Sequence, residues 1–329
     1  MFKDKTILID GGSGSWGNEL TKQLLNKGPK KIIIFSRGEL AQVNMQRKFK
    51  NDNVEFVIGD IRDYDAVDRL FQRGIDYVFH LAALKHVPVC ENQPQEAIKT
   101  NINGTINLIN AAIKYRVKKF IDVSTDKAVA PTNLYGMTKS VGEKLTIQAN
   151  NLTEDTDFVC IRGGNVLGSN GSVVPYFIDQ IKTQNKVSIT DNAMTRFFLT
   201  LPEAISLLFQ AVENSVGGET FVMNMPSFFI KDRAAVLIIH YGDDTTVIEE
   251  IGIREGEKID EVLISEHESE MSYKFNKDYY VILPTVKINK DYSHLDDSQK
   301  VTFKTFSSAD NLHSNEFLYD LLSKGGFLI

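Results

Sequence analysis

A tyrosine and a lysine four residues apart are the first side chains in this sequence that could carry out acid–base chemistry. Tyr135 and Lys139 fall in the predicted helix Tyr135–Ala149, where positions i and i+4 share one face. A phenol with a pKa near 10 must lose roughly two to three units to act as a base near neutral pH. Lys139 and an oxidised nicotinamide ring could supply that shift. With the hydroxyl of Thr125 just past a predicted strand, the pattern indicates a site for acid–base chemistry on a hydroxyl or carbonyl group.

A glycine-rich turn near the N-terminus provides a place for such a cofactor. It follows the apolar run Thr6–Ile9, precedes the predicted helix Asn18–Asn26, and has the spacing G-x-x-G-x-x-G. Glycines allow a tight turn and let backbone N–H groups approach a pyrophosphate at the start of a helix. We expect Asp10, the residue before the turn, to point away from the phosphates and to accept hydrogen bonds from neighbouring amides. The residues expected to hold the dinucleotide are Gly11, Ser13, Gly14, Ser15, Trp16 and Gly17.

The end of the second predicted strand, Lys31–Phe35, bears on the choice between the two nicotinamide dinucleotides. Sites for NAD place a carboxylate there to bind the ribose 2′-hydroxyl, whereas this strand is followed by Ser36 and Arg37. A guanidinium suits a 2′-phosphate, so the sequence favours NADP over NAD, unless Arg37 is only a solvated loop residue. After the third predicted strand, Asp60, followed by Ile61, could accept a hydrogen bond from the adenine amino group.

Strand-like and helix-like segments alternate in the first half of the chain, and this alternation predicts how these side chains are positioned. Strands separated by helices require right-handed βαβ crossovers and a parallel sheet. The fold class predicted is α/β, a Rossmann-type doubly wound parallel sheet with a smaller α+β C-terminal substrate lobe. The further strands expected are Val54–Ile58, Tyr77–Leu81, Phe120–Val123 and Phe158–Arg162, and the further helices are Leu40–Lys50, Asp65–Phe71 and Thr105–Lys114.

The alternation weakens after about residue 165, and the tail from residue 243 is polar, charged and rich in aromatic residues. No proline-rich or glycine–serine linker separates the two halves. We therefore predict an NADP-binding domain over residues 1–165 and a substrate lobe over residues 166–329, which share one cleft. Segments around residues 197–225 are expected to pack back onto the first domain.

Composition limits the classes of partner. The chain has 329 residues, 42% of them hydrophobic, and a formal net charge of −6, which is ordinary for a soluble globular protein. Nucleic-acid binding is disfavoured because it needs a basic face, and no apolar run approaches the ~20 residues that span a bilayer. The two cysteines, Cys90 and Cys160, are too few for a disulfide framework or a thiolate zinc site. We expect a cytoplasmic protein with no metal site.

Several stretches between residues 7 and 265 resemble one family. They include GGSGSWGNEL, VFHLAALKHVPVCE, STDKAVAPTNLYGMTKSVGEKL and the MTRF motif. Together they are similar to the extended short-chain dehydrogenases/reductases and, more narrowly, to the soluble UDP-N-acetylglucosamine 4,6-dehydratases. The resemblance implies conversion of UDP-N-acetylglucosamine to a UDP-4-keto-6-deoxy sugar, with inversion at C5, for bacterial-type surface glycan or glycoprotein sugars. It also implies a lyase whose NADP is reduced and reoxidised within each turnover, and we expect a homo-oligomer.

The pair Asp126–Lys127, directly after Thr125, distinguishes dehydration from simpler hydride chemistry. A 4-epimerase needs only the tyrosine, the lysine and the hydroxyl, whereas a dehydratase must also expel water from C6 with a further acid and base. The resemblance implies that Asp126 protonates the departing C6 hydroxyl and that Lys127 removes or returns the C5 proton. The alternative for the pair is a salt-bridged loop. The predicted catalytic residues are Thr125, Asp126, Lys127, Tyr135 and Lys139.

The remaining site residues follow from the matching motifs. Arginines suit the pyrophosphate of a nucleotide sugar, so Arg196 and Arg254 are the candidates for that contact. Near the cofactor the resemblance places Ala82, Ala83 and Lys85, besides Tyr135 and Lys139. The expected substrate contacts are Lys85, His86, Asn165, Ser172, Val173, Arg196 and Arg254.

Two other functions remain open from the sequence. A related NAD(P)-dependent nucleotide-sugar 4-epimerase or reductase would not need Asp126 and Lys127. A non-catalytic NADP-binding module would need none of the five catalytic residues, and their joint presence argues against it.

Overall fold

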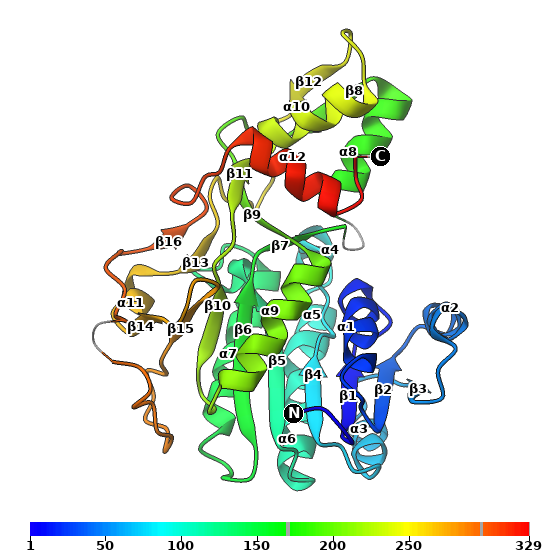
Figure 1. The fold of residues 1–329 in the computed structure, drawn as a ribbon, viewed down its shortest axis with the longest axis vertical. Helices are drawn as coiled ribbons and strands as arrows, with labels where there is room; N and C mark the ends of the chain where they lie inside the picture. The colour runs from blue at the N-terminus through cyan, green and yellow to red at the C-terminus, as the bar shows by residue number, and fades with distance from the viewer. Residues whose placement is uncertain (169–171, 297–298, 329) are drawn as a thin grey trace.

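Nine strands form the central sheet of the computed structural model, which describes residues 1–168, 172–296 and 299–328 (Figure 1). From β10 to β3 the strands run parallel, and β15 and β14 add an antiparallel edge. The spatial order across the sheet is β14 (Ser272–Lys274), β15 (Tyr279–Ile282), β10 (Thr220–Met223), β6 (Asp157–Gly163), β5 (Lys119–Thr125), β4 (Tyr77–His80), β1 (Thr6–Asp10), β2 (Lys31–Ser36) and β3 (Val54–Ile58).

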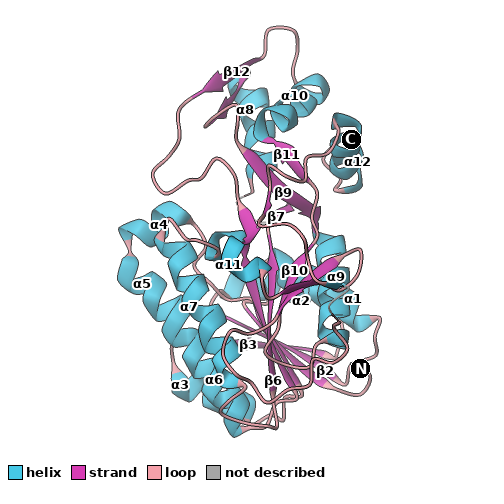
Figure 2. Cartoon of the chain, turned by 90° about the vertical axis from the view of Figure 1, so that its left-hand side faces the viewer, coloured by secondary structure: helices cyan, strands magenta, loops and turns pink. Residues whose placement is uncertain are grey.

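Helices cover both faces of this sheet because its strands are apolar on both sides (Figure 2). In β1, Ile7 and Ile9 face one core and Leu8 faces the other. Among the described residues, no helix combines the length and apolar character needed to cross a bilayer. The helices of this half are α1 (Ser15–Leu25), α2 (Glu39–Phe49), α3 (Tyr64–Phe71), α4 (Val87–Asn92), α5 (Pro94–Ile98), the π-helical turn η1 (Lys99–Asn103), α6 (Gly104–Lys114) and α7 (Leu134–Ala149).

The predicted doubly wound parallel sheet is confirmed, with local differences at its ends. Helix α1 begins at Ser15, three residues before the predicted start, because the glycine turn itself leads into the first helical turn. Helices α4, α5 and η1 form over residues 87–103, where the sequence pattern predicts no helix. Prolines stand in the first turns of α4 and α5, where their missing N–H costs no helical hydrogen bond.

A smaller lobe sits above the carboxyl ends of the sheet strands (Figure 1). Its apolar core is separate from the two cores of the sheet and lies between α8, α10, α12 and the short strands beside them. Strand β9 pairs with β7 and β11, β8 pairs with β12, and β13 pairs with β16. The remaining elements are β7 (Asn165–Leu167), α8 (Val173–Gln184), β8 (Lys186–Ile189), β9 (Thr195–Thr200), α9 (Leu201–Asn214), β11 (Ser227–Phe229), α10 (Ile230–Tyr241), β12 (Val247–Glu250), β13 (Val262–Ile264), α11 (Glu266–Ser269), β16 (Phe306–Ser307) and α12 (Asn315–Lys324).

The chain crosses between the two halves more than once. Strand β10 lies in the central sheet beside β6, and apolar residues of α9 join the same core as α1. Strands β14 and β15, from the polar tail, extend the sheet further, which the sequence analysis did not predict. The domain boundary at residue 165 therefore stays a prediction.

Candidate active site

The predicted catalytic residues meet at the carboxyl end of β5. Thr125 is the last residue of this strand, and Asp126 and Lys127 form the 3-10 turn η2 (Asp126–Ala128) that follows. Tyr135 lies in the first turn of α7, whose start is fixed by the Asn133 side chain accepting a hydrogen bond from the backbone of Gly136. This is the edge where doubly wound sheets bind their ligands.

Tyr135 is a neutral phenol in the protein without a cofactor. Burial raises its pKa, and the charges of Lys139 and Lys127 together with a hydrogen bond to Thr125 lower it by less. Lys139 is itself paired: its Nζ lies 2.7 Å from Oδ1 of Asp122, which is fully buried on β5. Asp122 was missed by the sequence analysis. The available signal was a carboxylate in an otherwise apolar buried strand, which requires a cation nearby.

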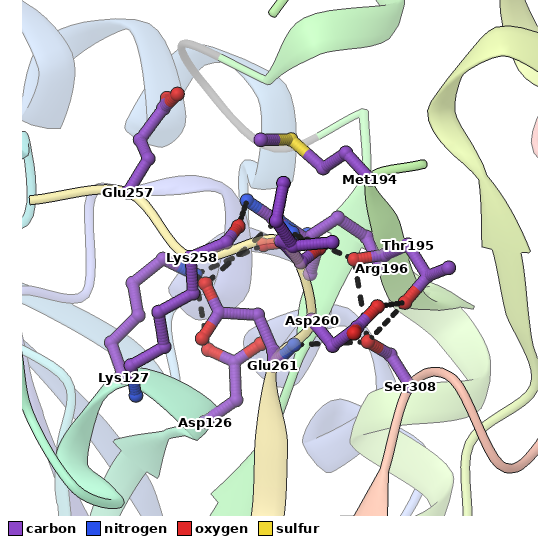
Figure 3. Close-up of polar contacts among 12 residues, drawn as sticks. Asp126, Lys127, Met194, Thr195, Arg196, Glu257, Lys258, Asp260, Glu261 and Ser308 are labelled. Atoms are coloured by element: carbon purple, nitrogen blue, oxygen red, sulfur yellow. Dashed lines mark hydrogen bonds and ion pairs between the residues drawn. The ribbon is translucent and has the colours of Figure 1, made fainter. Parts of the chain in front are cut away.

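Lys127 lies between two carboxylates (Figure 3). Its Nζ is 3.0 Å from Oδ1 of Asp126 and 3.7 Å from Oε1 of Glu261. Burial lowers the pKa of Lys127, but the negative charges of Asp126 and Glu261 outweigh burial and raise it overall. Lys127 is therefore an ammonium group in a salt bridge, the arrangement expected if the pair were only a loop contact. The catalytic roles of Asp126 and Lys127 stay a prediction.

Thr125 and Asn165 complete the polar ring around this pair. The Thr125 hydroxyl donates to Oδ1 of Asp126 at 2.8 Å, and Oδ1 of Asn165 lies 3.5 Å from Nζ of Lys127. The second oxygen of Asp126, Oδ2, is buried and has no hydrogen-bond partner among the described residues. A buried carboxyl oxygen in this state suits a hydroxyl donor from a ligand.

The glycine turn fits the pyrophosphate of a dinucleotide. Gly11 has a φ of +62°, and a Cβ at this position would lie 2.7 Å from the backbone nitrogen of Ala82. Gly14 caps α1 without a side-chain hydrogen bond, and the first turn, which holds Ser15, Trp16 and Gly17, contains no acid. The amides at the start of α1 can therefore face an anion.

Asp10 points away from that anion position, as expected. Its Oδ1 accepts hydrogen bonds from the backbone N–H groups of Leu81 and Ala82, at 3.2 and 2.9 Å. It also lies 2.8 Å from Nδ1 of His80, whose Nε2 lies 2.9 Å from Thr105 Oγ1. Asp10 thus ties the end of β1 to the loop after β4 that holds Ala82 and Ala83.

The predicted adenosine end is built around Ser36 and Asp60. Ser36 Oγ accepts a hydrogen bond from the hydroxyl of Ser13 at 2.9 Å, which links the glycine turn to β2. Burial raises the pKa of Asp60, but hydrogen bonds from Arg62 and its charge outweigh burial, so the pKa is lowered overall. Arg37 is half exposed, with Nη1 3.9 Å from Oδ2 of Asp60. Next to Asp60, Ile61 is buried in the sheet core.

The loop after β4 carries Lys85 and His86, which are both exposed at the start of α4. In the smaller lobe, Ser172 and Val173 begin α8, and the Ser172 hydroxyl is buried without a hydrogen-bond partner in the described part of the chain. Arg254 is 56% exposed and faces Glu257.

Arg196 has a role that the sequence analysis did not predict. Its guanidinium donates to the carbonyl oxygens of Thr195, Ile259 and Lys258 at 2.7, 2.9 and 2.9 Å. These bonds fasten the segment before β13 to β9, and they bring Glu261 to the catalytic turn (Figure 3). The contact of Arg196 with a diphosphate stays a prediction.

The doubly wound sheet, the glycine turn and the tyrosine–lysine pair define a short-chain dehydrogenase/reductase. Within this class, the chain belongs to the polysaccharide biosynthesis protein family, whose sequence profile matches residues 7–283.

Three known proteins illustrate the relationship. A Campylobacter jejuni protein named UDP-N-acetylglucosamine 4,6-dehydratase (inverting) is 44% identical over 292 residues, which cover 88% of this chain and 85% of that protein. A Rickettsia akari protein named UDP-glucose 4-epimerase is 43% identical over 271 residues, 80% of this chain and 79% of that protein. The X-ray structure of Pen from Bacillus thuringiensis superposes with a TM-score of 0.92 at 39% identity, and 100% of each chain is covered.

Proposed function

We propose that this protein is a nucleotide-sugar 4,6-dehydratase that converts UDP-N-acetylglucosamine to a UDP-4-keto-6-deoxy sugar. The observation that carries the proposal is the turn Asp126–Lys127, which adds two proton-transfer groups beside Thr125 and Tyr135. Loss of water from C6 needs such groups, whereas hydride removal at C4 does not. The 44% identity to a protein named for this reaction supports the substrate.

Each of the four residues has one proposed role in the reaction. Thr125 orients the C4 hydroxyl and Tyr135 accepts its proton. Burial raises the pKa of the phenol and the charges of Lys139 and Lys127 lower it, and a bound oxidised nicotinamide would lower it further. A proton on the unpartnered Oδ2 of Asp126 would reach the C6 hydroxyl and leave with it as water. Lys127, an ammonium group in the resting protein, first passes a proton to Asp126 across their 3.0 Å contact. The neutral amine then accepts the C5 proton, while the protonated Asp126 gives its proton to the departing C6 hydroxyl.

The cofactor proposed is NADP, held by the glycine turn with Arg37 at its 2′-phosphate. When bound, NADP would supply a hydride acceptor for C4 and a hydride donor for C6, so that no reductant would be consumed. Support for NADP over NAD comes from the end of β2, where Ser36 and Arg37 offer a hydroxyl and a guanidinium rather than a carboxylate. Arg37→Ala should weaken NADP binding by about tenfold or more and leave NAD binding within about twofold, because a phosphate–guanidinium contact contributes roughly 1.5–3 kcal/mol.

The test incubates the protein with UDP-N-acetylglucosamine in D₂O and follows the sugar by NMR and mass spectrometry. Dehydration predicts loss of water, deuterium at C5 and no net NADPH, and the configuration at C5 tests the expected inversion. Isomerisation at C4 without loss of water would instead assign a 4-epimerase, the activity in the name of the Rickettsia relative. Binding of NADP without turnover of UDP-, dTDP- or GDP-sugars would indicate a non-catalytic module.

Tyr135→Phe tests the assigned base. Turnover should fall at least about a hundredfold while NADP affinity changes little, since general base catalysis typically contributes 10²–10⁴-fold. Tyr176→Phe, at an exposed tyrosine of α8, is the matched control and should keep normal turnover.

We also propose a cytoplasmic homo-oligomer. Val89, Ile98, Met137 and Val141 are exposed apolar residues on α4, α5 and α7, which lie together on one side of the sheet (Figure 2). Covering this surface with a second copy would remove apolar area from water. Light scattering after gel filtration tests the assembly, with Val141→Lys expected to shift it toward monomer.

The two cysteines, both buried and unpaired, fit a reducing compartment.

A further inference from the structure

Glu261 is a buried carboxylate that the segment before β13 presents to the catalytic turn. It directly precedes β13, and its backbone is fixed on both sides: its N–H donates to Ser308 Oγ at 2.9 Å, and its carbonyl accepts from the Ser308 N–H at 2.8 Å. Only 3% of the residue is exposed. Figure 3 shows its side chain turned toward Asp126 and Lys127, while the neighbouring Asp260 turns toward Thr195.

The carboxylate of Glu261 has charged neighbours but few hydrogen bonds. Oε1 lies 3.7 Å from Nζ of Lys127 and 3.8 Å from Nε of Arg196. Oε2 is buried and has no hydrogen-bond partner in the part of the chain that the structure describes, like Oδ2 of Asp126. A purely structural carboxylate at this depth would normally have both oxygens satisfied. Lys127 is thus flanked by two incompletely bonded carboxylates.

We propose that Glu261 is a positioning residue that, together with Asp126, holds Lys127 as an ammonium group aimed at the reacting centre. The consequence for the reaction rests on the proposed function. In the resting protein Lys127 donates a proton before it can accept one, and the segment before β13 helps to set this state. The loop that carries Glu261 therefore takes part in the chemistry that the sheet residues begin.

The effect of Glu261 on the pKa of Lys127 depends on the other charges around that lysine. Arg196 and Lys258 oppose the ammonium form of Lys127, and Asp126 and Glu261 favour it. With Glu261 neutralised, Asp126 would be the one carboxylate left in an ion pair with Lys127 among the described residues. The pKa of Lys127 should then fall. The ionisable and charged groups that face Lys127 are Asp126 from η2, Tyr135 from α7, Arg196 from β9, and Lys258 and Glu261 from the segment before β13.

The test compares Glu261→Gln with Asp260→Asn, the same loss of charge one residue away on the opposite side of the backbone. Reductive methylation with formaldehyde at pH 9, followed by peptide mass spectrometry, measures how fast each amine reacts. Only the neutral amine reacts, so a one-unit fall in the pKa of Lys127 makes it react tenfold faster. We expect at least tenfold faster labelling of Lys127 in Glu261→Gln and no change in Asp260→Asn, relative to the exposed Lys304.

Two further measurements distinguish the loss of the Glu261 charge from a general opening of the site. Lys139, buried against Asp122, should stay unlabelled in Glu261→Gln, because an opened site would expose both lysines. Glu261→Asp keeps the charge and should restore labelling of Lys127 to within about threefold of wild type. Equal labelling of Lys127 in Glu261→Gln and Asp260→Asn, or joint labelling of Lys127 and Lys139, would overturn the proposal. Since no substrate is present, failure of the dehydratase assay would leave this result unaffected.

Discussion

Arg162 in the sheet and Arg233 in the smaller lobe are both buried guanidinium groups, and their surroundings differ completely. Arg162 on β6 donates to both carboxylate oxygens of Glu143 on α7 and of Glu268 on α11. Arg233 on α10 stacks over the ring of Phe198 at 3.4 Å, and none of its three nitrogen atoms has a hydrogen-bond partner among the described residues.

The difference teaches how the two halves use charge. In the sheet the two carboxylates outweigh burial and raise the pKa of Arg162. In the smaller lobe, burial and the nearby charge of Arg196 lower the pKa of Arg233. The sheet therefore uses an ion pair to join α7 and α11, while the smaller lobe keeps positive charge without a bonded acid. Such charge suits the anionic substrate proposed for that lobe.

The largest expected effect is on Arg162→Met, which should lower the free energy of unfolding by about 3–5 kcal/mol. Removing one member of a buried ion network leaves the Glu143 and Glu268 carboxylates without their cation. Urea unfolding followed by circular dichroism measures the change. Arg116→Met removes an exposed ion pair to Asp155 and should cost no more than about 0.5 kcal/mol. Equal losses in the two variants would mean that burial does not distinguish these pairs.

Asp10→Asn tests another buried carboxylate of the sheet. It should lower the free energy of unfolding by about 1–3 kcal/mol. The substitution keeps an acceptor for the Leu81 and Ala82 amides but removes the charge that faces His80. Because these bonds fix the loop that Gly11 packs against, NADP affinity should fall as well. Isothermal titration with NADP measures the second effect, and Asp4→Asn, at an exposed turn residue, provides the control. Unchanged stability and affinity would assign Asp10 no positioning role.

The same contrast explains what the sequence could predict. The strands and helices of the sheet follow from local apolar periodicity, and the glycine turn and Tyr135–Lys139 pair are local motifs. The charged partners of these side chains are distant in the sequence: Glu268 is 106 residues from Arg162, and Glu261 reaches Lys127 from the segment before β13. Arg196 was predicted to meet a diphosphate, yet its bonds to backbone carbonyls depend on how a remote loop folds. Local patterns carry no information about such contacts.

Acid should weaken the ion network of Arg162, Glu143 and Glu268. Burial raises the pKa of Glu268, but the charge and hydrogen bonds of Arg162 outweigh burial and lower it overall. A carboxylate whose folded-state pKa lies below its unfolded value stabilises the protein above that unfolded value, and this contribution is lost as pH falls through the folded pKa. Stability should therefore decline below about pH 5, and less steeply in Glu268→Gln. Parallel acid profiles of wild type and Glu268→Gln would contradict this assignment.

Arg233→Met should have the smallest effect, a change of less than about 1 kcal/mol in either direction. The variant loses the stacking of the guanidinium on Phe198, which contributes about 2 kcal/mol when desolvated. It also removes the penalty of a buried cation without hydrogen bonds and places an apolar chain among the apolar side chains of α8, α10 and α12. These terms have opposite signs and similar size. Urea unfolding beside Arg162→Met gives a direct comparison. A loss of 3 kcal/mol or more in the free energy of unfolding would show that Arg233 contributes as much to stability as Arg162.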